Sequence, residues 1–118
     1  MILVKGLITT KDVAKSKAKA LLNSVYPSFK NFPQVEKYAL VLEIKKTFFD
    51  LLKYLNAAEN VPSRRKFNLI EADNTLQLLK VFYQISRDQK YISQGFFERI
   101  DLELSEIGKL IGGWLKSI

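Results

Sequence analysis

The chain has 118 residues, of which 47% are apolar and 26% are charged, enough for one domain with a hydrophobic core. It has no cysteine and no histidine, which excludes disulfides, thiol chemistry and imidazole-assisted nucleophiles. A net charge of +7 favours an anionic partner. No apolar stretch is long enough to span a membrane, and no basic segment precedes the first apolar run. We therefore expect a cytoplasmic protein without membrane association.

The positive charge is concentrated in two regions. Residues 1–33 carry six lysines and one acidic residue, and residues 60–90 carry six basic and three acidic residues. A di-iron bundle needs Glu-x-x-His pairs that face inward, and this chain has no histidine. The acidic residues of the second and fourth predicted helices lie mostly off the apolar seams. The sequence thus predicts no metal, no cofactor and no catalytic residue.

The first predicted helix begins at Asp12, after residues 1–10, which form either a short strand or a disordered leader. Apolar residues recur on one face of this helix: Ala14, Ala18, Leu21, Leu22 and Val25. Lys15 and Lys19 flank that face. Tyr26-Pro27 ends the helix, because the residue before a proline is disfavoured in the helical region.

The second predicted helix runs from about Gln34 to Glu59. Pro33 suits its first turn, and Glu36 complements the helix dipole. The core stripe consists of Val41, Ile44, Phe48, Leu51, Leu55 and Ala58. Further apolar residues widen it: Leu42, Phe49 and Leu52. So broad a face predicts burial against more than one neighbour.

The third predicted helix runs from about Arg64 to Lys90, after a break at Asn60-Val61-Pro62, with Ser63 as its N-cap. One apolar stripe consists of Leu69, Ala72, Leu76, Leu79 and Tyr83. A second consists of Leu78, Val81, Phe82 and Ile85. The second stripes of this helix and the previous one exceed the needs of a monomer, so we expect a homo-oligomer.

The last predicted helix runs from its cap, Ser93, to Ile118. Its seam consists of Phe97, Ile100, Leu104, Ile107, Ile111, Trp114 and Ile118. Three glycines interrupt it beside the only tryptophan, Trp114: Gly108, Gly112 and Gly113. Because each helical glycine costs roughly 1 kcal/mol, they indicate a close backbone contact for helix or subunit packing. Alternatively, the last two glycines only fray the helix end.

Three long helices with short links must lie antiparallel, and the shorter first helix completes the set. We therefore predict a single domain over residues 1–118. Its fold class is all-α, an up-down-up-down four-helix bundle that forms oligomers.

Basic residues at the start of the third helix form the main candidate binding site. Arg64, Arg65 and Lys66 lie where free backbone N–H groups also favour an anion, so they predict a phosphate site. On the same helix, Lys80 and Arg87 extend the positive charge, and Lys15 and Lys19 of the first helix are further candidates. The alternatives are a solvated helix end and ordinary ion pairs.

Several motifs resemble the accessory variability determinant (Avd) proteins of diversity-generating retroelements. They are Val25-Tyr26-Pro27, Phe32-Pro33-x-x-Glu36-Lys37-Tyr38, Ser93 and the terminal run Glu106-Ile107-Gly108-Lys109-x-x-Gly112-Gly113-Trp114-x-Lys116. The resemblance covers about Lys19 to Ser117, and the terminal run is its most specific part.

This resemblance implies a homopentameric barrel of four-helix bundles with a basic surface. It also implies a non-catalytic protein that binds the element's reverse transcriptase and template RNA and thereby supports mutagenic copying. DNA is a further candidate ligand. The alternative is a structural oligomeric bundle of the type encoded in ribosomal RNA intervening sequences, with no role in nucleic-acid binding.

Overall fold

The computed structural model describes the backbone of residues 2–118 and the side chains of residues 13–118. It contains four α-helices, α1 (Ile2–Val25), α2 (Leu40–Asn60), α3 (Arg65–Asp88) and α4 (Gln94–Lys116). Three short 3-10 helices connect them, η1 (Tyr26–Asn31), η2 (Gln34–Glu36) and η3 (Pro62–Arg64). No strand occurs between residues 2 and 118. Residues 2–10 belong to α1, so the prediction of a short strand or a disordered leader there is wrong, and the first helix starts before the predicted Asp12.

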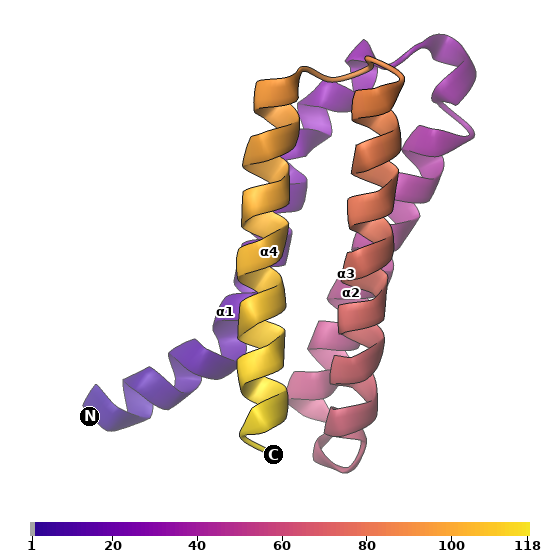
Figure 1. Ribbon diagram of the computed structural model, residues 1–118. Coiled ribbons are helices and arrows are strands. Elements are labelled where there is room, and N and C mark those ends of the chain that lie inside the picture. The colour runs from indigo at the N-terminus through magenta and orange to yellow at the C-terminus, as the bar shows by residue number, and fades with distance from the viewer. Residues whose placement is uncertain (1) are drawn as a thin grey trace.

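The helices are arranged as the sequence predicted. Helix α2 packs against α3, α3 packs against α4, and α1 contacts both α2 and α4. Successive helices run in opposite directions (Figure 1). The prediction of an all-helical fold is therefore confirmed, and the packing is compatible with a four-helix bundle. Within the described part of the chain, no helix combines the length and the apolar character that crossing a membrane requires.

The core consists of the predicted stripes. Every member of the main apolar stripes of the four helices is buried except Ile118, which is 59% exposed because α4 ends two residues earlier, at Lys116. Phe48 of α2 and Tyr83 of α3 meet edge-on, with ring centroids 6.4 Å apart. Burying each large apolar side chain contributes roughly 1.5–3 kcal/mol, so these stripes are the main stabilising feature of the fold.

Two helix ends agree with the prediction, and one predicted helix cap does not. Helix α1 ends at Val25, just before Tyr26-Pro27. Ser93 caps α4, because its Oγ accepts a hydrogen bond from the Phe96 backbone N–H at 3.1 Å. The cap predicted at Ser63 is wrong. Pro62 starts a 3-10 turn that includes Ser63, and α3 begins one turn later without a side-chain cap.

The predicted start of the second helix is also wrong, since α2 begins at Leu40 rather than at Gln34. Val35 and Tyr38 are 80% and 78% exposed, so no apolar anchor in this segment holds it against the core. Glu36 nevertheless has the predicted role, because its Oε1 accepts a hydrogen bond from the Leu40 backbone N–H at 3.3 Å.

The second apolar stripes lie largely on the surface of the chain. On α2, Leu42 and Phe49 are about two-fifths exposed. On α3, five apolar side chains are between 39% and 48% exposed: Phe67, Ile70, Leu78, Val81 and Ile85. At 100° per residue these five project from one side of α3, away from the core. We call them the outer α3 stripe.

Candidate nucleic-acid interface

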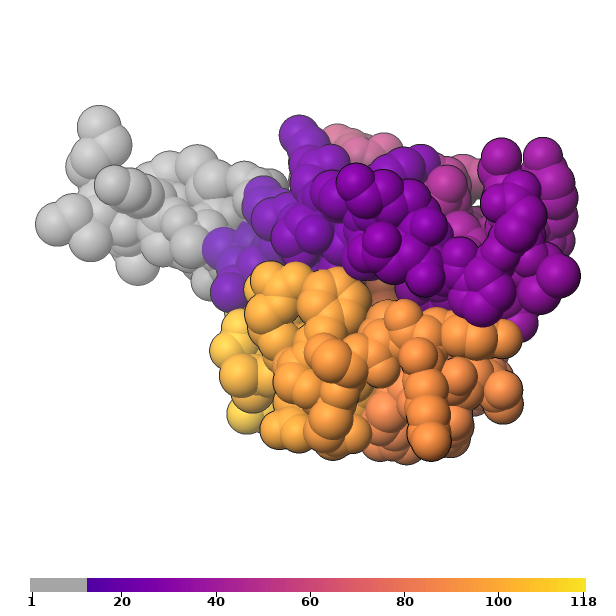
Figure 2. All heavy atoms as spheres, turned by 90° about the horizontal axis from the view of Figure 1, so that it is seen from above, coloured from indigo at the N-terminus to yellow at the C-terminus, as the bar shows by residue number. Residues whose placement is uncertain are grey.

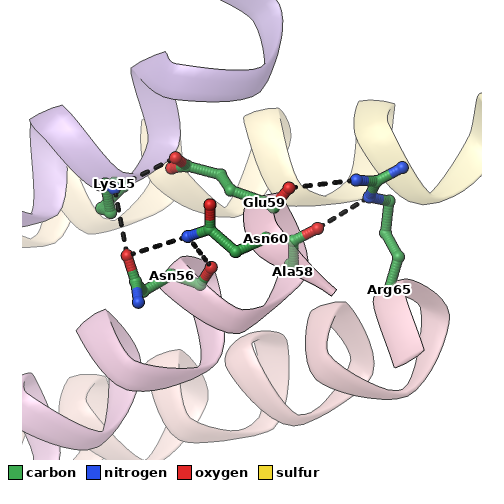
Figure 3. Close-up of polar contacts among 6 residues, drawn as sticks. All are labelled: Lys15, Asn56, Ala58, Glu59, Asn60 and Arg65. Atoms are coloured by element: carbon green, nitrogen blue, oxygen red, sulfur yellow. Dashed lines mark hydrogen bonds and ion pairs between the residues drawn. The ribbon is translucent and has the colours of Figure 1, made fainter. Parts of the chain in front are cut away.

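The three cations predicted to form a phosphate site at the start of α3 differ in their contacts, although Arg65 and Lys66 both line one cavity of about 480 Å³. Arg65 turns back onto the end of α2, where its Nε donates to the Ala58 carbonyl at 2.7 Å and its Nη2 to the Glu59 carbonyl at 3.2 Å (Figure 3). Its guanidinium also lies 5.8 Å from the centroid of Trp114. Because the last carbonyls of a helix have no partner within it, Arg65 acts as a cap for α2.

Arg64 and Lys66 face solvent instead. The Arg64 guanidinium lies over the Phe67 ring at 4.7 Å from its centroid, and both basic side chains are exposed. Neither forms an ion pair with a residue between 13 and 118. Cations at a helix N-terminus are mildly unfavourable, by roughly 0.3–1 kcal/mol, and an anionic ligand would offset that cost.

Of the two α1 lysines predicted as binding residues, one holds helices together and the other is exposed. Lys15 forms an ion pair with Glu59 at 3.0 Å and donates to Asn56 Oδ1 at 3.2 Å (Figure 3). It therefore links α1 to the C-terminal end of α2. Lys19 is exposed and forms no ion pair with residues 13–118.

Lys80 and Arg87 both have polar partners within the chain. The Lys80 ammonium donates to Ser105 Oγ at 2.9 Å, which ties α3 to α4. Arg87 forms an ion pair with Asp88 at 3.0 Å, and its guanidinium lies 4.3 Å from the centroid of Phe97. Of the seven predicted cations, Lys19, Arg64 and Lys66 thus remain exposed without a polar partner among the described side chains.

The glycines of α4 have different surroundings. A Cβ at Gly108 would lie 3.1 Å from Leu76 Cδ2, so α3 and α4 approach closely there. A Cβ at Gly112 or Gly113 would have no neighbour within 4 Å among the described side chains. Helix α4 continues past both to Lys116, so they do not mark its frayed end. The buried Trp114 packs in the core, and of the three predicted glycines only Gly108 makes a close contact with residues 13–118.

A second basic cluster was not found by sequence reasoning. Lys30, Lys37 and Lys45 line one cavity of about 380 Å³, formed by η1, η2 and the start of α2. In the sequence, the three lysines recur seven and eight residues apart beside aromatic residues, and this spacing could have predicted the cluster. It predicts the cluster only weakly, because each lysine comes from a different segment of the chain. We call this feature the lysine cavity.

No group of three His, Cys, Asp or Glu side chains converges in a metal-binding arrangement within the described part of the chain.

A family model described as bAvd-like matches residues 12–118. The chain belongs to the bAvd-like family. The resemblance inferred from the motifs is therefore confirmed. No curated protein and no solved structure matches the chain significantly. Membership of the bAvd-like family suggests an accessory protein of retroelements.

Proposed function

We propose that this bAvd-like protein is a non-catalytic accessory protein of a diversity-generating retroelement. In this role it binds the element's reverse transcriptase and template RNA and supports mutagenic copying. The observation that carries the proposal is the family match over residues 12–118. The net charge of +7 agrees with a nucleic-acid ligand. A protein of this kind needs no catalytic group of its own.

The template RNA would contact the exposed cations rather than all seven predicted ones. Arg64, Lys66 and Lys19 have side chains in solvent and no acidic partner among residues 13–118. Lys15, Lys80, Arg65 and Arg87 are held by contacts within the chain. Their electrostatic field still attracts phosphates, but their side chains are not free to reorient toward a ligand.

The test of RNA binding is fluorescence anisotropy of labelled single-stranded RNA over a salt series. Counterion release gives a log–log salt slope of roughly 0.7 per phosphate contact on single strands. The variant Arg64→Gln/Lys66→Gln should bind more weakly and with a slope lower by about 1.4. Arg65 stays in place because its loss would disturb the fold.

The matched control is Lys53→Gln/Lys109→Gln, which removes the same charge from exposed sites on α2 and α4. It should leave the slope close to that of the parent protein. Equal slopes for the two double variants would rule out Arg64 and Lys66 as phosphate ligands. A parent protein that binds no RNA at low salt would favour the structural bundle without a nucleic-acid role.

The second partner is tested by co-expression with the reverse transcriptase of the same element. We expect the two proteins to co-purify after nuclease treatment, which separates a protein contact from a bridge through RNA. Loss of the complex after nuclease treatment would contradict direct binding to the polymerase.

We further propose that the protein assembles as a homopentamer, as the family resemblance implies, through the outer α3 stripe. An apolar row of this length is rarely left on the surface of a monomer. A second copy of the same chain is its proposed occupant, because the apolar residues follow a heptad-like spacing typical of helix–helix seams.

Sedimentation equilibrium tests this assembly. Leu78→Glu places a charge in the outer α3 stripe and should shift the protein toward monomers. Leu102→Glu is the matched control, since Leu102 is an exposed leucine, 62% accessible, on α4. A parent protein that is monomeric at micromolar concentration, or equal behaviour of the two variants, would contradict the proposed interface.

A further inference from the structure

The lysine cavity lies at the end of the bundle opposite η3. Figure 2 looks onto this end, where the α1–α2 connection (purple) lies beside the α3–α4 connection (orange). The buried rings of Phe29 and Phe32, each 7% exposed, anchor η1 and the turn that follows it. Pro27 and Pro33 restrict the backbone on either side of these anchors. The walls of the cavity are thus preformed.

The charge in the cavity is entirely positive. Its lining residues include three lysines and no acidic residue. Glu36, the acidic residue nearest in sequence to Lys37, faces elsewhere. Its two carboxylate oxygens accept hydrogen bonds from the Leu40 backbone N–H and from the Tyr91 hydroxyl. Neither Lys30 nor Lys37 forms an ion pair with residues 13–118, so both ammonium groups can bind an anion.

An aromatic surface lies next to these charges. Tyr26 is 43% exposed, and its ring is held edge-on against Phe29, with centroids 5.6 Å apart. The Lys45 ammonium lies 4.9 Å from the centroid of Tyr26 and 5.4 Å from that of Phe29. Lys45 therefore fixes the Tyr26 ring and places a positive charge over it. A flat ring next to ammonium groups is the combination that binds one base and its phosphate.

We propose that the lysine cavity binds one unstacked nucleotide of a single-stranded RNA or DNA. Its phosphate contacts Lys30 and Lys37, and its base stacks on the exposed part of Tyr26. A volume of about 380 Å³ lies in the range of small-molecule sites, and a base within a duplex would not expose the required face. This inference rests on the proposed function and assigns a separate site for the same class of ligand.

The test compares Tyr26→Leu with Tyr26→Phe in anisotropy with single-stranded RNA. Tyr26→Leu removes the ring on which the base stacks, so it should lower the affinity for single-stranded RNA on the order of tenfold. Tyr26→Phe keeps the ring and should bind like the parent protein. With a duplex of equal length, Tyr26→Leu and the parent protein should bind equally. Circular dichroism melting checks that both variants are folded.

The lysines are tested through the salt dependence of binding. Lys30→Gln/Lys37→Gln should lower the log–log salt slope by about 1.4, whereas Lys53→Gln/Lys109→Gln should not change it. Competition with adenosine monophosphate distinguishes a free nucleotide from a strand. We expect it to displace RNA only at concentrations far above that of the competing strand.

The outcomes separate a failure of the cavity as a nucleotide site from a failure of the proposed function. If the parent binds RNA but Tyr26→Leu and Lys30→Gln/Lys37→Gln bind like it, the cavity is not a nucleotide site and the proposed function stands. Displacement of RNA by the mononucleotide at equimolar concentration would overturn the assignment to a strand. A parent protein that binds no RNA would overturn the proposed function, and the cavity's assignment with it.

Discussion

The two ends of the bundle use their basic residues differently. At the η3 end, Arg65 and Lys15 form hydrogen bonds or ion pairs with the last turn of α2 (Figure 3). At the η1–η2 end, Lys30 and Lys37 line a cavity without an acidic residue. Both ends are rich in basic residues in the sequence. A cluster of cations in a sequence therefore does not distinguish residues that stabilise the fold from residues that are free to bind a ligand.

The difference follows from which helix end each cation meets. The C-terminal turn of α2 presents carbonyl groups without partners and a partial negative charge, which attract a guanidinium. The start of α2 presents N–H groups, which bind the carboxylate of Glu36 instead. Lysines near that start gain nothing from the backbone and remain available for an anionic ligand.

The largest effect is expected at the η3 end. Arg65→Ala should lower the free energy of unfolding by about 3 kcal/mol, because it removes two charge-assisted hydrogen bonds to partly buried carbonyl groups and the contact with Trp114. Urea unfolding measures the change. Lys66→Ala, one residue along the chain, is the control and should stay within about 0.5 kcal/mol of the parent. Similar losses for both variants would mean that Arg65 is an ordinary surface cation.

A smaller effect is expected at the η1–η2 end. Glu36→Ala should lower the free energy of unfolding by about 1.5 kcal/mol, because Glu36 accepts hydrogen bonds from the Leu40 N–H and, at 2.8 Å, from the Tyr91 hydroxyl. Glu36→Gln keeps a neutral acceptor and should lose less. If Glu36→Ala destabilises the protein more than Arg65→Ala does, the assignment of the structural contacts to the η3 end is wrong.

The pH dependence of stability isolates the Tyr91 contact. The hydrogen bond to Glu36, with smaller contributions from burial and the carboxylate charge, raises the pKa of Tyr91 above its ordinary value. The hydrogen bond between Tyr91 and Glu36 therefore contributes fully to stability below the pKa of about 10 that tyrosine has in the unfolded chain. This contribution is lost as the pH rises through the pKa of Tyr91 in the folded protein. Unfolding at pH 8 and pH 11 should show a larger alkaline loss for the parent than for Tyr91→Phe. Equal losses would show that the contact is absent in solution.

The fold was predictable because apolar periodicity decides it. The main stripes of all four helices are buried nearly without exception, and a period of 3.6 residues identifies such a face from the sequence alone. One error is the start of α1, which lies at Ile2 rather than at Asp12, and the others are at Ser63 and Gln34, where 3-10 turns replace the expected helix ends. Local propensity cannot separate a 3-10 turn from the first turn of an α-helix, and a proline suits both.

The candidate site was less predictable because it depends on contacts between distant residues. Arg65 and Lys66 are neighbours with the same charge, yet one caps α2 and the other faces solvent. Lys30 and Lys45 come together only when η1 folds against α2. The sequence near each of these basic residues does not specify its partner. The positive charge could therefore be predicted, but not whether a residue stabilises the fold or is free to bind a ligand.

The smallest expected effect concerns Gly112, in the last part of α4 near the η3 end. Because a Cβ there meets no atom within 4 Å, Gly112→Ala should stabilise the protein by roughly 0.5–1 kcal/mol through its higher helix propensity. Gly108→Ala is the matched comparison and should gain less, since its Cβ would lie 3.1 Å from Leu76 Cδ2. Thermal melting and sedimentation are measured together. If Gly112→Ala instead lowers stability and reduces the sedimenting mass, another subunit contacts this glycine, and the η3 end belongs to a subunit interface, as proposed for the outer α3 stripe.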